Sequence, residues 1–219
     1  MKVSAFVQAG FIGLAGLSVF AFVSMARDAE TRRGCVPICV MRPNYAGQNR
    51  TAPDFELLDE HGAKVRLSQF RGKTVVLNFW TTTCQPCLEE MPSLADLTKV
   101  LRTRENVVVL TVSTDASKET ADTTLQTLLQ GKPPFAVLYD PEADVVRGKY
   151  GTSLYPETWV IDPRGVIRAR FDGARDWTNA MFLDLLDSFA RSPACGVEFQ
   201  AGALTGDGEA MCDEAGAEG

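Results

Sequence analysis

Residues 74–92 read Thr-Val-Val-Leu-Asn-Phe-Trp-Thr-Thr-Thr-Cys-Gln-Pro-Cys-Leu-Glu-Glu-Met-Pro. The apolar run at residues 75–80 is rich in β-branched and aromatic side chains, which is typical of a buried strand. A short Thr-rich connection leads to Cys84 and Cys87, where we expect a helix to begin. Two cysteines three positions apart at a strand-to-helix junction indicate a redox site.

The length of 219 residues is enough for one domain with extensions. With 45% hydrophobic and 23% charged residues, the chain can build an ordinary core. The net charge of −6 argues against a nucleic-acid partner, because such a protein usually shows a basic patch. Part of the acidity lies in a Gly/Ala-rich C-terminal tail, so the folded part is closer to neutral.

The N-terminal segment is almost wholly apolar, and residues 3–25 carry no charge. A membrane span needs about 20 such residues, whereas the apolar core of a signal peptide has about 7–15. We therefore favour an N-terminal membrane anchor over residues 1–26, with a signal peptide cleaved after Ser24-Met25-Ala26 as the alternative. In both cases the rest of the chain is expected to be exported. Three arginines soon after the span disagree with that orientation, although acidic residues lie among them.

The composition divides the chain into segments. They are the anchor or signal peptide (1–26), a polar linker with Cys35 and Cys39 (27–50), a folded domain (51–192) and an acidic tail with Cys195 and Cys212 (193–219). The tail lacks hydrophobic periodicity, and we expect it to have no regular structure.

Hydrophobic periodicity within the domain predicts strands and helices in alternation. The expected elements are a hairpin at 52–67, a helical turn at 68–73, strands at 75–80, 106–112, 135–139, 158–161 and 166–171, and helices at 84–104, 117–130, 141–150 and 176–191. Strand–helix–strand units give parallel neighbours, whereas the last two strands form a hairpin. The pattern therefore predicts a mixed sheet with helices on both faces.

The two central cysteines are suited to cycling between a dithiol and a disulfide, because a two-residue spacer at a helix start keeps the sulfur atoms within bonding reach. Cys84 lies at the expected helix N-terminus, where free N–H groups and the helix dipole favour a thiolate. Cys87 lies one turn inside and is shielded. We assign Cys84 as the attacking thiolate and Cys87 as the resolving thiol of thiol–disulfide exchange.

Glu90 follows Cys87 by three residues and therefore falls on the same side of the helix. Its carboxylate is a candidate proton acceptor when Cys87 must attack. Spacing alone leaves open the alternative that Glu90 is a solvated helix residue. Pro92 stands inside the expected helix, where a proline costs about 3 kcal/mol and bends the axis.

A structural zinc half-site is an alternative interpretation of the cysteine pair. Zinc normally takes four ligands, but the chain has one histidine, His61, and no second Cys-x-x-Cys motif. His61 precedes Gly62 and is interpreted as a turn residue. We expect neither a metal nor a cofactor.

Five motifs carry a resemblance to a known family. In chain order they are Ala52-Pro53-Asp54-Phe55, Leu67-Ser68-Gln69-Phe70-Arg71-Gly72-Lys73, Val75-Val76-Leu77-Asn78-Phe79-Trp80, Cys84-x-x-Cys87-x-x-Glu90-x-Pro92 and Tyr155-Pro156-Glu157-Thr158-Trp159-Val160-Ile161-Asp162. Over residues 51–191 the chain resembles the TlpA/ResA-like thioredoxins, which are exported and usually membrane-tethered thiol–disulfide oxidoreductases. Tyr150-Gly151 followed by Pro156-Glu157-Thr158 is similar to the cytochrome c maturation branch.

The resemblance implies an α/β, thioredoxin-like fold: a mixed central sheet flanked by helices, with an N-terminal β-hairpin and a central insert at about residues 113–150. It implies that Pro156 is a cis-proline facing the cysteine pair, and that this loop and the backbone of Tyr155 offer hydrogen-bonding groups to a substrate strand. It also ties Glu90 to the active-site cysteines. Thr83 departs from the family, which commonly has an aromatic residue there, so substrate shape and reduction potential stay open.

The outer cysteines, Cys35, Cys39, Cys195 and Cys212, allow three pairings. Structural disulfides are one hypothesis, since such bonds persist in an oxidising compartment. A second redox relay that exchanges electrons with Cys84 and Cys87 is the other hypothesis, and no feature of the sequence favours it.

Several functions fit these features. The leading hypothesis is a reductant for exported proteins such as apocytochromes, anchored on the periplasmic face of a bacterial inner membrane or free in the periplasm. Its partners would be protein dithiol or disulfide substrates and a membrane electron donor or acceptor. A peroxiredoxin-type peroxidase is the runner-up, because that group shares Ala52-Pro53-Asp54-Phe55 and Thr81-x-x-Cys84. A copper or haem chaperone that uses the thiols as soft ligands ranks lower.

Overall fold

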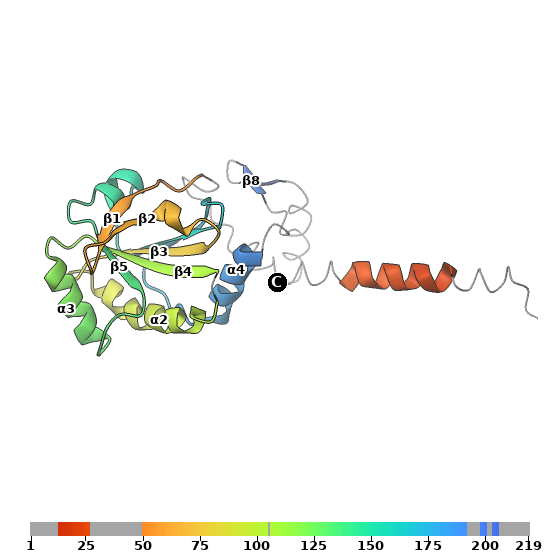
Figure 1. Cartoon of the computed structure of the whole chain (residues 1–219), viewed down its shortest axis with the longest axis horizontal. Coiled ribbons are helices and arrows are strands. Elements are labelled where there is room, and N and C mark those ends of the chain that lie inside the picture. Colours follow the sequence, from red (N-terminus) through yellow and green to blue (C-terminus); the bar gives the residue numbers. More distant parts are fainter. Residues whose placement is uncertain (1–12, 27–49, 105, 192–197, 201–202, 206–219) are drawn as a thin grey trace, which may run out of the picture.

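Strand β3, Thr74–Trp80, lies at the centre of the sheet, and its β-branched and aromatic side chains fill both of its faces. The computed structural model describes residues 13–26, 50–104, 106–191, 198–200 and 203–205, and in it all seven residues of β3 are buried. β3 belongs to a seven-stranded sheet of order β2-β1-β5-β4-β3-β6-β7 (Figure 1).

The remaining elements follow the predicted order, with boundaries displaced by a few residues. The strands are β1 (Glu56–Asp59), β2 (Lys64–Arg66), β4 (Val107–Ser113), β5 (Ala136–Tyr139), β6 (Glu157–Ile161) and β7 (Ile167–Asp172). The helices are α2 (Gln85–Leu101), α3 (Lys118–Leu128) and α4 (Ala180–Arg191), and the shorter helical segments are η1 (Leu67–Phe70) and η2 (Asp144–Lys149). The segment predicted as a central insert contains α3, β5 and η2.

The pairing of the strands confirms the predicted mixed sheet. β3 runs parallel to β4, and β4 runs parallel to β5, while β3 and β6 are antiparallel. The β6–β7 pair and the β1–β2 hairpin are also antiparallel, and the hairpin joins the sheet through β5. Both parallel crossovers step in the same direction across the sheet, so right-handed connections put α2 and α3 on the same face.

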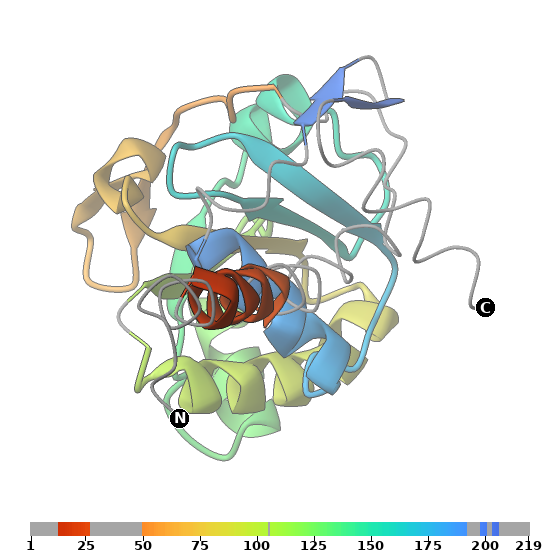
Figure 2. The ribbon, with the colours of Figure 1, turned by 90° about the vertical axis from the view of Figure 1, so that its right-hand side faces the viewer.

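Two apolar cores fill the two faces of the sheet. Val76 and Trp80 of β3 pack with buried residues of α2, α3 and α4 on one face. Val75, Leu77 and Phe79 point to the other face, which is covered by η1, η2 and residues 52–55. Figure 2 shows α2 and α4 on one side of the sheet and η2 on the other. Helical segments therefore cover both faces as predicted, but all three long helices share one face.

Tyr150, at the end of η2, holds this segment against the sheet. Its ring lies 5.1 Å from that of Phe79 and 5.5 Å from that of Trp159, both at steep interplanar angles. Its hydroxyl donates to the carbonyl of Pro53 at 3.1 Å. Edge-to-face aromatic pairs add about 0.5–1.5 kcal/mol beyond their buried area. The Tyr150-Gly151 motif therefore has a packing role.

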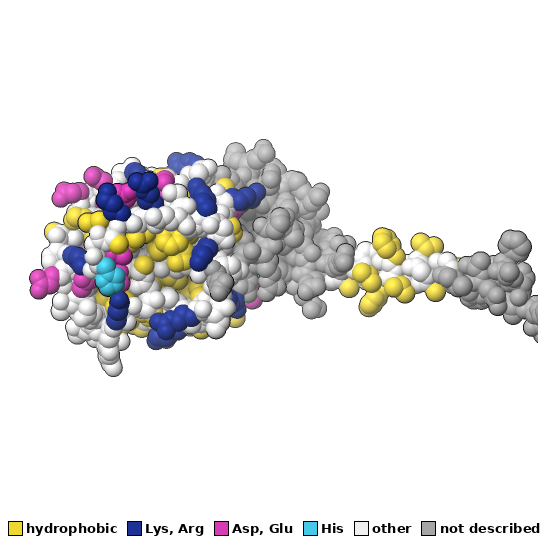
Figure 3. Space-filling view, viewed as in Figure 1, with side chains coloured by type: hydrophobic (Ala, Val, Ile, Leu, Met, Phe, Trp, Pro, Cys, Tyr) yellow, Lys and Arg dark blue, Asp and Glu magenta, His cyan; other side chains and the backbone are white. Residues whose placement is uncertain are grey.

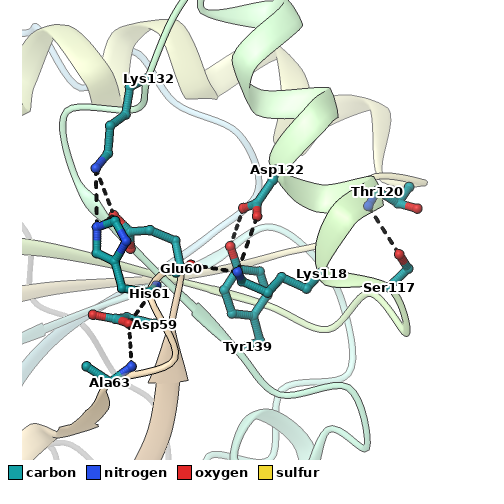
Figure 4. A network of polar contacts seen from close by, with 10 residues as sticks. All are labelled: Asp59, Glu60, His61, Ala63, Ser117, Lys118, Thr120, Asp122, Lys132 and Tyr139. Carbon is teal, nitrogen blue, oxygen red and sulfur yellow. Dashed lines mark hydrogen bonds and ion pairs between the residues drawn. The ribbon is translucent and has the colours of Figure 1, made fainter.

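The β1–β2 hairpin is attached to α3 at its tip (Figure 4). Lys118 Nζ donates to the carbonyl of Glu60 at 2.6 Å, and Lys132 lies 3.5 Å from the Glu60 carboxylate. The His61 side chain is 67% exposed and lies 3.4 Å from Lys132 Nζ. His61 is thus a turn residue, as predicted from Gly62 beside it.

The described part of the apolar N-terminal segment, residues 13–26, is a helix, and its large apolar side chains are exposed (Figure 3). Within the described residues, no helix is long and apolar enough to cross a membrane. The four outer cysteines, Cys35, Cys39, Cys195 and Cys212, lie outside the described residues, and their pairing stays a prediction. The expectation of a tail without regular structure is wrong in one place, because β8 (Glu198–Gln200) and β9 (Ala203–Thr205) pair as an antiparallel hairpin.

We predict that Leu77→Ala destabilises the domain by about 2–5 kcal/mol, because the substitution leaves a cavity in a fully buried site of β3. Urea unfolding measures the change. Leu154, whose side chain is 80% exposed, provides the control, and Leu154→Ala should stay within about 0.5 kcal/mol of the parent. Equal effects of the two substitutions would contradict this packing.

Candidate active site

The cysteine pair lies at the junction between β3 and α2. Cys84 is the N-cap residue of α2, and it is joined to Cys87 by a disulfide with Cα atoms 5.3 Å apart. The Cys87 N–H donates to Cys84 Sγ at 3.2 Å, so the sulfur atom accepts one of the free N–H groups of the first helical turn. Cys84 is half-buried and Cys87 is fully buried. An incoming disulfide can therefore reach Cys84 and not Cys87.

The loop before β6 lies at the same end of β3. The Tyr155–Pro156 peptide bond is cis, in agreement with the implication of the family resemblance. β6 begins directly after it, with Glu157 opposite Phe79 in the antiparallel register, so Pro156 falls level with the strand end that leads to Cys84. Tyr155 and Cys84 pack against the same apolar core. Leu154 beside them is 80% exposed.

Glu90 is buried on the inner side of α2, with only 2% of its surface exposed. Asn78 Nδ2 donates to Glu90 Oε1 at 2.7 Å, and Trp177 Nε1 and the Arg175 N–H donate to Oε2 at 3.1 and 3.2 Å. Burial raises the pKa of Glu90, because the loss of water around the carboxylate outweighs these three donors. Glu90 is therefore not the solvated helix residue that spacing alone had left open.

Comparisons with known proteins agree with this geometry. Residues 49–170 match the AhpC/TSA family. The chain is 34% identical to the thiol–disulfide oxidoreductase ResA of Geobacillus thermodenitrificans over 123 residues, which are 56% of this chain and 68% of the relative. The chain belongs to the AhpC/TSA family.

Other relatives of this AhpC/TSA protein have the same thioredoxin-like character. The thioredoxin-like protein YneN of Bacillus subtilis is 33% identical over 126 residues, covering 55% of this chain and 69% of the relative. Among solved structures, a putative thiol:disulfide interchange protein DsbE from Chlorobium tepidum superposes with a TM-score of 0.57 at 27% identity, covering 65% of this chain and 97% of that one. This AhpC/TSA protein is accordingly a thioredoxin-like thiol–disulfide oxidoreductase.

Asn78 is a site residue that sequence reasoning missed. Its amide lies between Glu90 and Thr158, and Nδ2 donates to both side chains. The signal was present, because Asn78 is the one polar residue in the apolar run at residues 75–80. No sequence pattern pointed to Trp177, since it lies 87 positions after Glu90 and contacts it only in the folded chain.

Glu157, directly after the cis-proline, is a second buried carboxylate of this AhpC/TSA protein. It accepts hydrogen bonds from Thr152 Oγ1 and Trp159 Nε1, and Arg170 Nε lies 3.5 Å from its other oxygen. Burial raises the pKa of Glu157 against the opposing effect of these partners. Glu157 belongs to the Tyr155-to-Asp162 motif, and in the structure it anchors the start of β6.

The connection from β3 to Cys84 is held by a carboxylate that sequence reasoning also missed. Asp115, two residues after β4, accepts hydrogen bonds from both Thr81 and Thr82. Thr83, where the chain departs from the family, is exposed. Among the described residues, no group of three or more histidine, cysteine, aspartate or glutamate side chains is arranged to hold a metal ion.

We predict a pH-dependent effect of Glu90→Gln on stability. Because the pKa of Glu90 is higher in the folded than in the unfolded chain, its contribution is most favourable below the unfolded pKa and is lost as the pH rises through the folded pKa. Gln carries no charge at any pH. The unfolding free energy of the Gln variant minus that of the parent should therefore be larger at pH 8 than at pH 4.

Urea unfolding of the oxidised proteins at the two pH values measures this difference. Glu89→Gln is the matched control, because Glu89 is an exposed neighbour on the same helix and its substitution removes no buried carboxylate. A difference for Glu90→Gln that is constant, or that shrinks toward pH 8, would rule out a buried carboxylate with a raised pKa.

Proposed function

We propose that this protein is an exported, membrane-tethered thiol–disulfide oxidoreductase that reduces disulfides in extracytoplasmic proteins through Cys84 and Cys87. The observation that carries the proposal is the cysteine pair itself, with one half-buried and one fully buried sulfur at the start of α2. The names of the ResA and DsbE relatives support the same reaction class.

The proposed reaction begins with the reduced pair. The Cys84 thiolate, favoured by the N-terminus of α2, attacks one sulfur of a substrate disulfide, and a mixed disulfide forms as the first substrate thiolate leaves. Cys87 then gives up its proton and attacks Cys84 Sγ, which releases the second substrate thiolate. The substrate gains two electrons, and the protein is left with the Cys84–Cys87 disulfide. A membrane dithiol donor would return the pair to the reduced state.

Glu90 is the proposed acceptor of the Cys87 proton. It lies one helical turn beyond Cys87, and both side chains are buried. A carboxylate with a raised pKa accepts a proton near neutral pH more readily than an ordinary glutamate does. Glu90 also borders an open hollow with Ser93 and Arg175, through which the proton could pass to water.

Substrate binding is assigned to the loop at Tyr155 and Pro156. Its place level with the end of β3 supports a substrate segment that runs alongside this loop and brings its disulfide to Cys84. The motifs Tyr150-Gly151 and Pro156-Glu157-Thr158 support apocytochromes as the substrates. The uncharged segment at residues 3–25 supports an anchor that holds the domain on the periplasmic face of the inner membrane.

A thiol peroxidase is the second candidate function. The match to the AhpC/TSA family and the Thr81-x-x-Cys84 pattern favour it. However, the peroxiredoxin pattern has a proline where this chain has Leu77, and peroxiredoxins do not usually resolve through a Cys-x-x-Cys pair.

We predict that Cys87→Ser accumulates mixed disulfides between Cys84 and exported proteins, because the resolving thiol is gone. Non-reducing gels followed by mass spectrometry detect these species. Cys84→Ser, in which the attacking sulfur is removed, should trap none. Rapid stoichiometric oxidation of the Cys87→Ser protein by peroxide, without protein adducts, would instead favour the peroxidase.

We predict that the full chain stays with the membrane fraction after a high-salt wash, whereas a chain that lacks residues 1–26 is released. Fractionation of cells that produce each form, followed by immunoblotting, tests this. If the gene for the full chain instead yields a shortened product in the soluble periplasmic fraction, the segment is a cleaved signal peptide.

A further inference from the structure

Asp115 lies where the two central parallel strands end together. Trp80 and Ser113 are the last residues of β3 and β4, and they stand opposite each other in the register. The Thr114 N–H donates to the Trp80 carbonyl at 3.1 Å, so the two chains stay side by side beyond the strands. Asp115 is thereby placed next to the segment that leads from β3 to Cys84.

The carboxylate of Asp115 accepts hydrogen bonds from that segment and from the end of β4. Oδ1 accepts from the hydroxyls of Thr81 and Thr82 at 2.8 and 2.6 Å, and from the Thr82 N–H at 3.0 Å. Oδ2 accepts from the same N–H at 3.0 Å and from the Ser113 hydroxyl at 2.7 Å. These donors are all neutral hydroxyl and amide groups. None of them brings a positive charge to the carboxylate.

The segment held by Asp115 is a tight turn that ends at the attacking cysteine. The Cys84 N–H donates to the Thr81 carbonyl at 3.1 Å, which closes a four-residue turn whose end Cα atoms lie within about 7 Å. Asp115 thus accepts hydrogen bonds from the first two residues of the turn, and Cys84 is the last residue of the turn.

We propose that Asp115 is a positioning residue for the Cys84 thiol: it fixes the turn that precedes the cysteine and keeps a negative charge against that turn. The inference rests on the proposed role of Cys84 as the attacking thiolate. A carboxylate near a thiolate repels it, whereas the N-terminus of α2 attracts it. Asp115 therefore limits how much of Cys84 is ionised and how strongly oxidising the Cys84–Cys87 disulfide is.

Asp115→Asn tests the role of the charge, because Asn keeps the shape and one acceptor oxygen for the turn. In the reduced protein at pH 6, we expect iodoacetamide to alkylate Cys84 about two- to ten-fold faster than in the parent, and the thiol to titrate at lower pH. Mass spectrometry of the peptide that contains Cys84 follows the reaction separately from the other cysteines. Equilibration with glutathione should give a less negative reduction potential, since the thiolate form is stabilised.

Thr82→Val is the opposing variant, because it removes the donor at 2.6 Å and leaves the carboxylate. With its charge less compensated, Asp115 should slow alkylation of Cys84 at pH 6. Asp162→Asn is the matched control: Asp162 also accepts backbone N–H groups of a turn, but it follows the end of β6 that pairs with Val75, about 17 Å along β3 from Trp80. Its Cys84 kinetics should equal those of the parent.

The proposal is overturned if Asp115→Asn leaves the alkylation rate and the potential unchanged, or if both variants shift the rate in the same direction. Should Asp115→Asn fail to fold, the slower alkylation expected for Thr82→Val still decides the matter. Failure here is distinguishable from failure of the proposed function, because mixed-disulfide trapping by Cys87→Ser reports on protein substrates whether or not Asp115 influences Cys84.

Discussion

The register of β3 with its two neighbours is the constraint on which the rest of the site depends. Parallel pairing with β4 brings Asp115 to the end of β3, and antiparallel pairing with β6 brings the cis-proline loop to the same end. A shift of one residue in either pairing would turn every side chain of a strand to the opposite face. Since both faces of β3 are packed with large side chains, such a shift is strongly disfavoured, and the parts of the site are held together by the core.

The burial of Glu90 in this core costs free energy, which hydrogen bonds to its carboxylate must offset. An uncompensated carboxylate would be driven to its neutral form, and hydrogen bonds to a charged group recover about 1.5–3 kcal/mol each. The donors come from β3, through Asn78, and from the segment between β7 and α4, through Trp177 and Arg175. Ser93 ties the same segment to α2, because it donates to the Arg175 carbonyl and accepts from the Trp177 N–H. Two distant parts of the chain must therefore dock before the carboxylate is satisfied.

The sequence predicted those features of the site that depend on local spacing. The strand at residues 75–80, the helix start at Cys84 and the side of the helix that carries Glu90 all follow from periodicity, and the cis bond before Pro156 follows from the family resemblance. Asp115 and Trp177 were missed because their partners are brought to them by strand pairing and packing. The helix expected from residue 176 begins at Ala180, because contacts with a distant part of the chain hold the preceding residues outside the helix. The residues before it form turns, in which the Asp176 and Asn179 side chains accept from Thr178 and Met181, and they carry the Glu90 contacts.

Two carboxylates with different surroundings lie on the elements that position the two cysteines: Glu90 on α2, and Asp115 against the turn that ends at Cys84. Glu90 is buried on the inner side of α2, one helical turn beyond Cys87, and is the proposed acceptor of its proton. Asp115 is half-buried and accepts hydrogen bonds from neutral groups, and its proposed effect on Cys84 opposes that of the helix dipole. In the proposed mechanism, Glu90 assists the release of substrate by Cys87, and Asp115 limits the ionisation of Cys84. In this proposal the threonines that matter for the ionisation of Cys84 are Thr81 and Thr82, which hold Asp115, rather than the exposed Thr83.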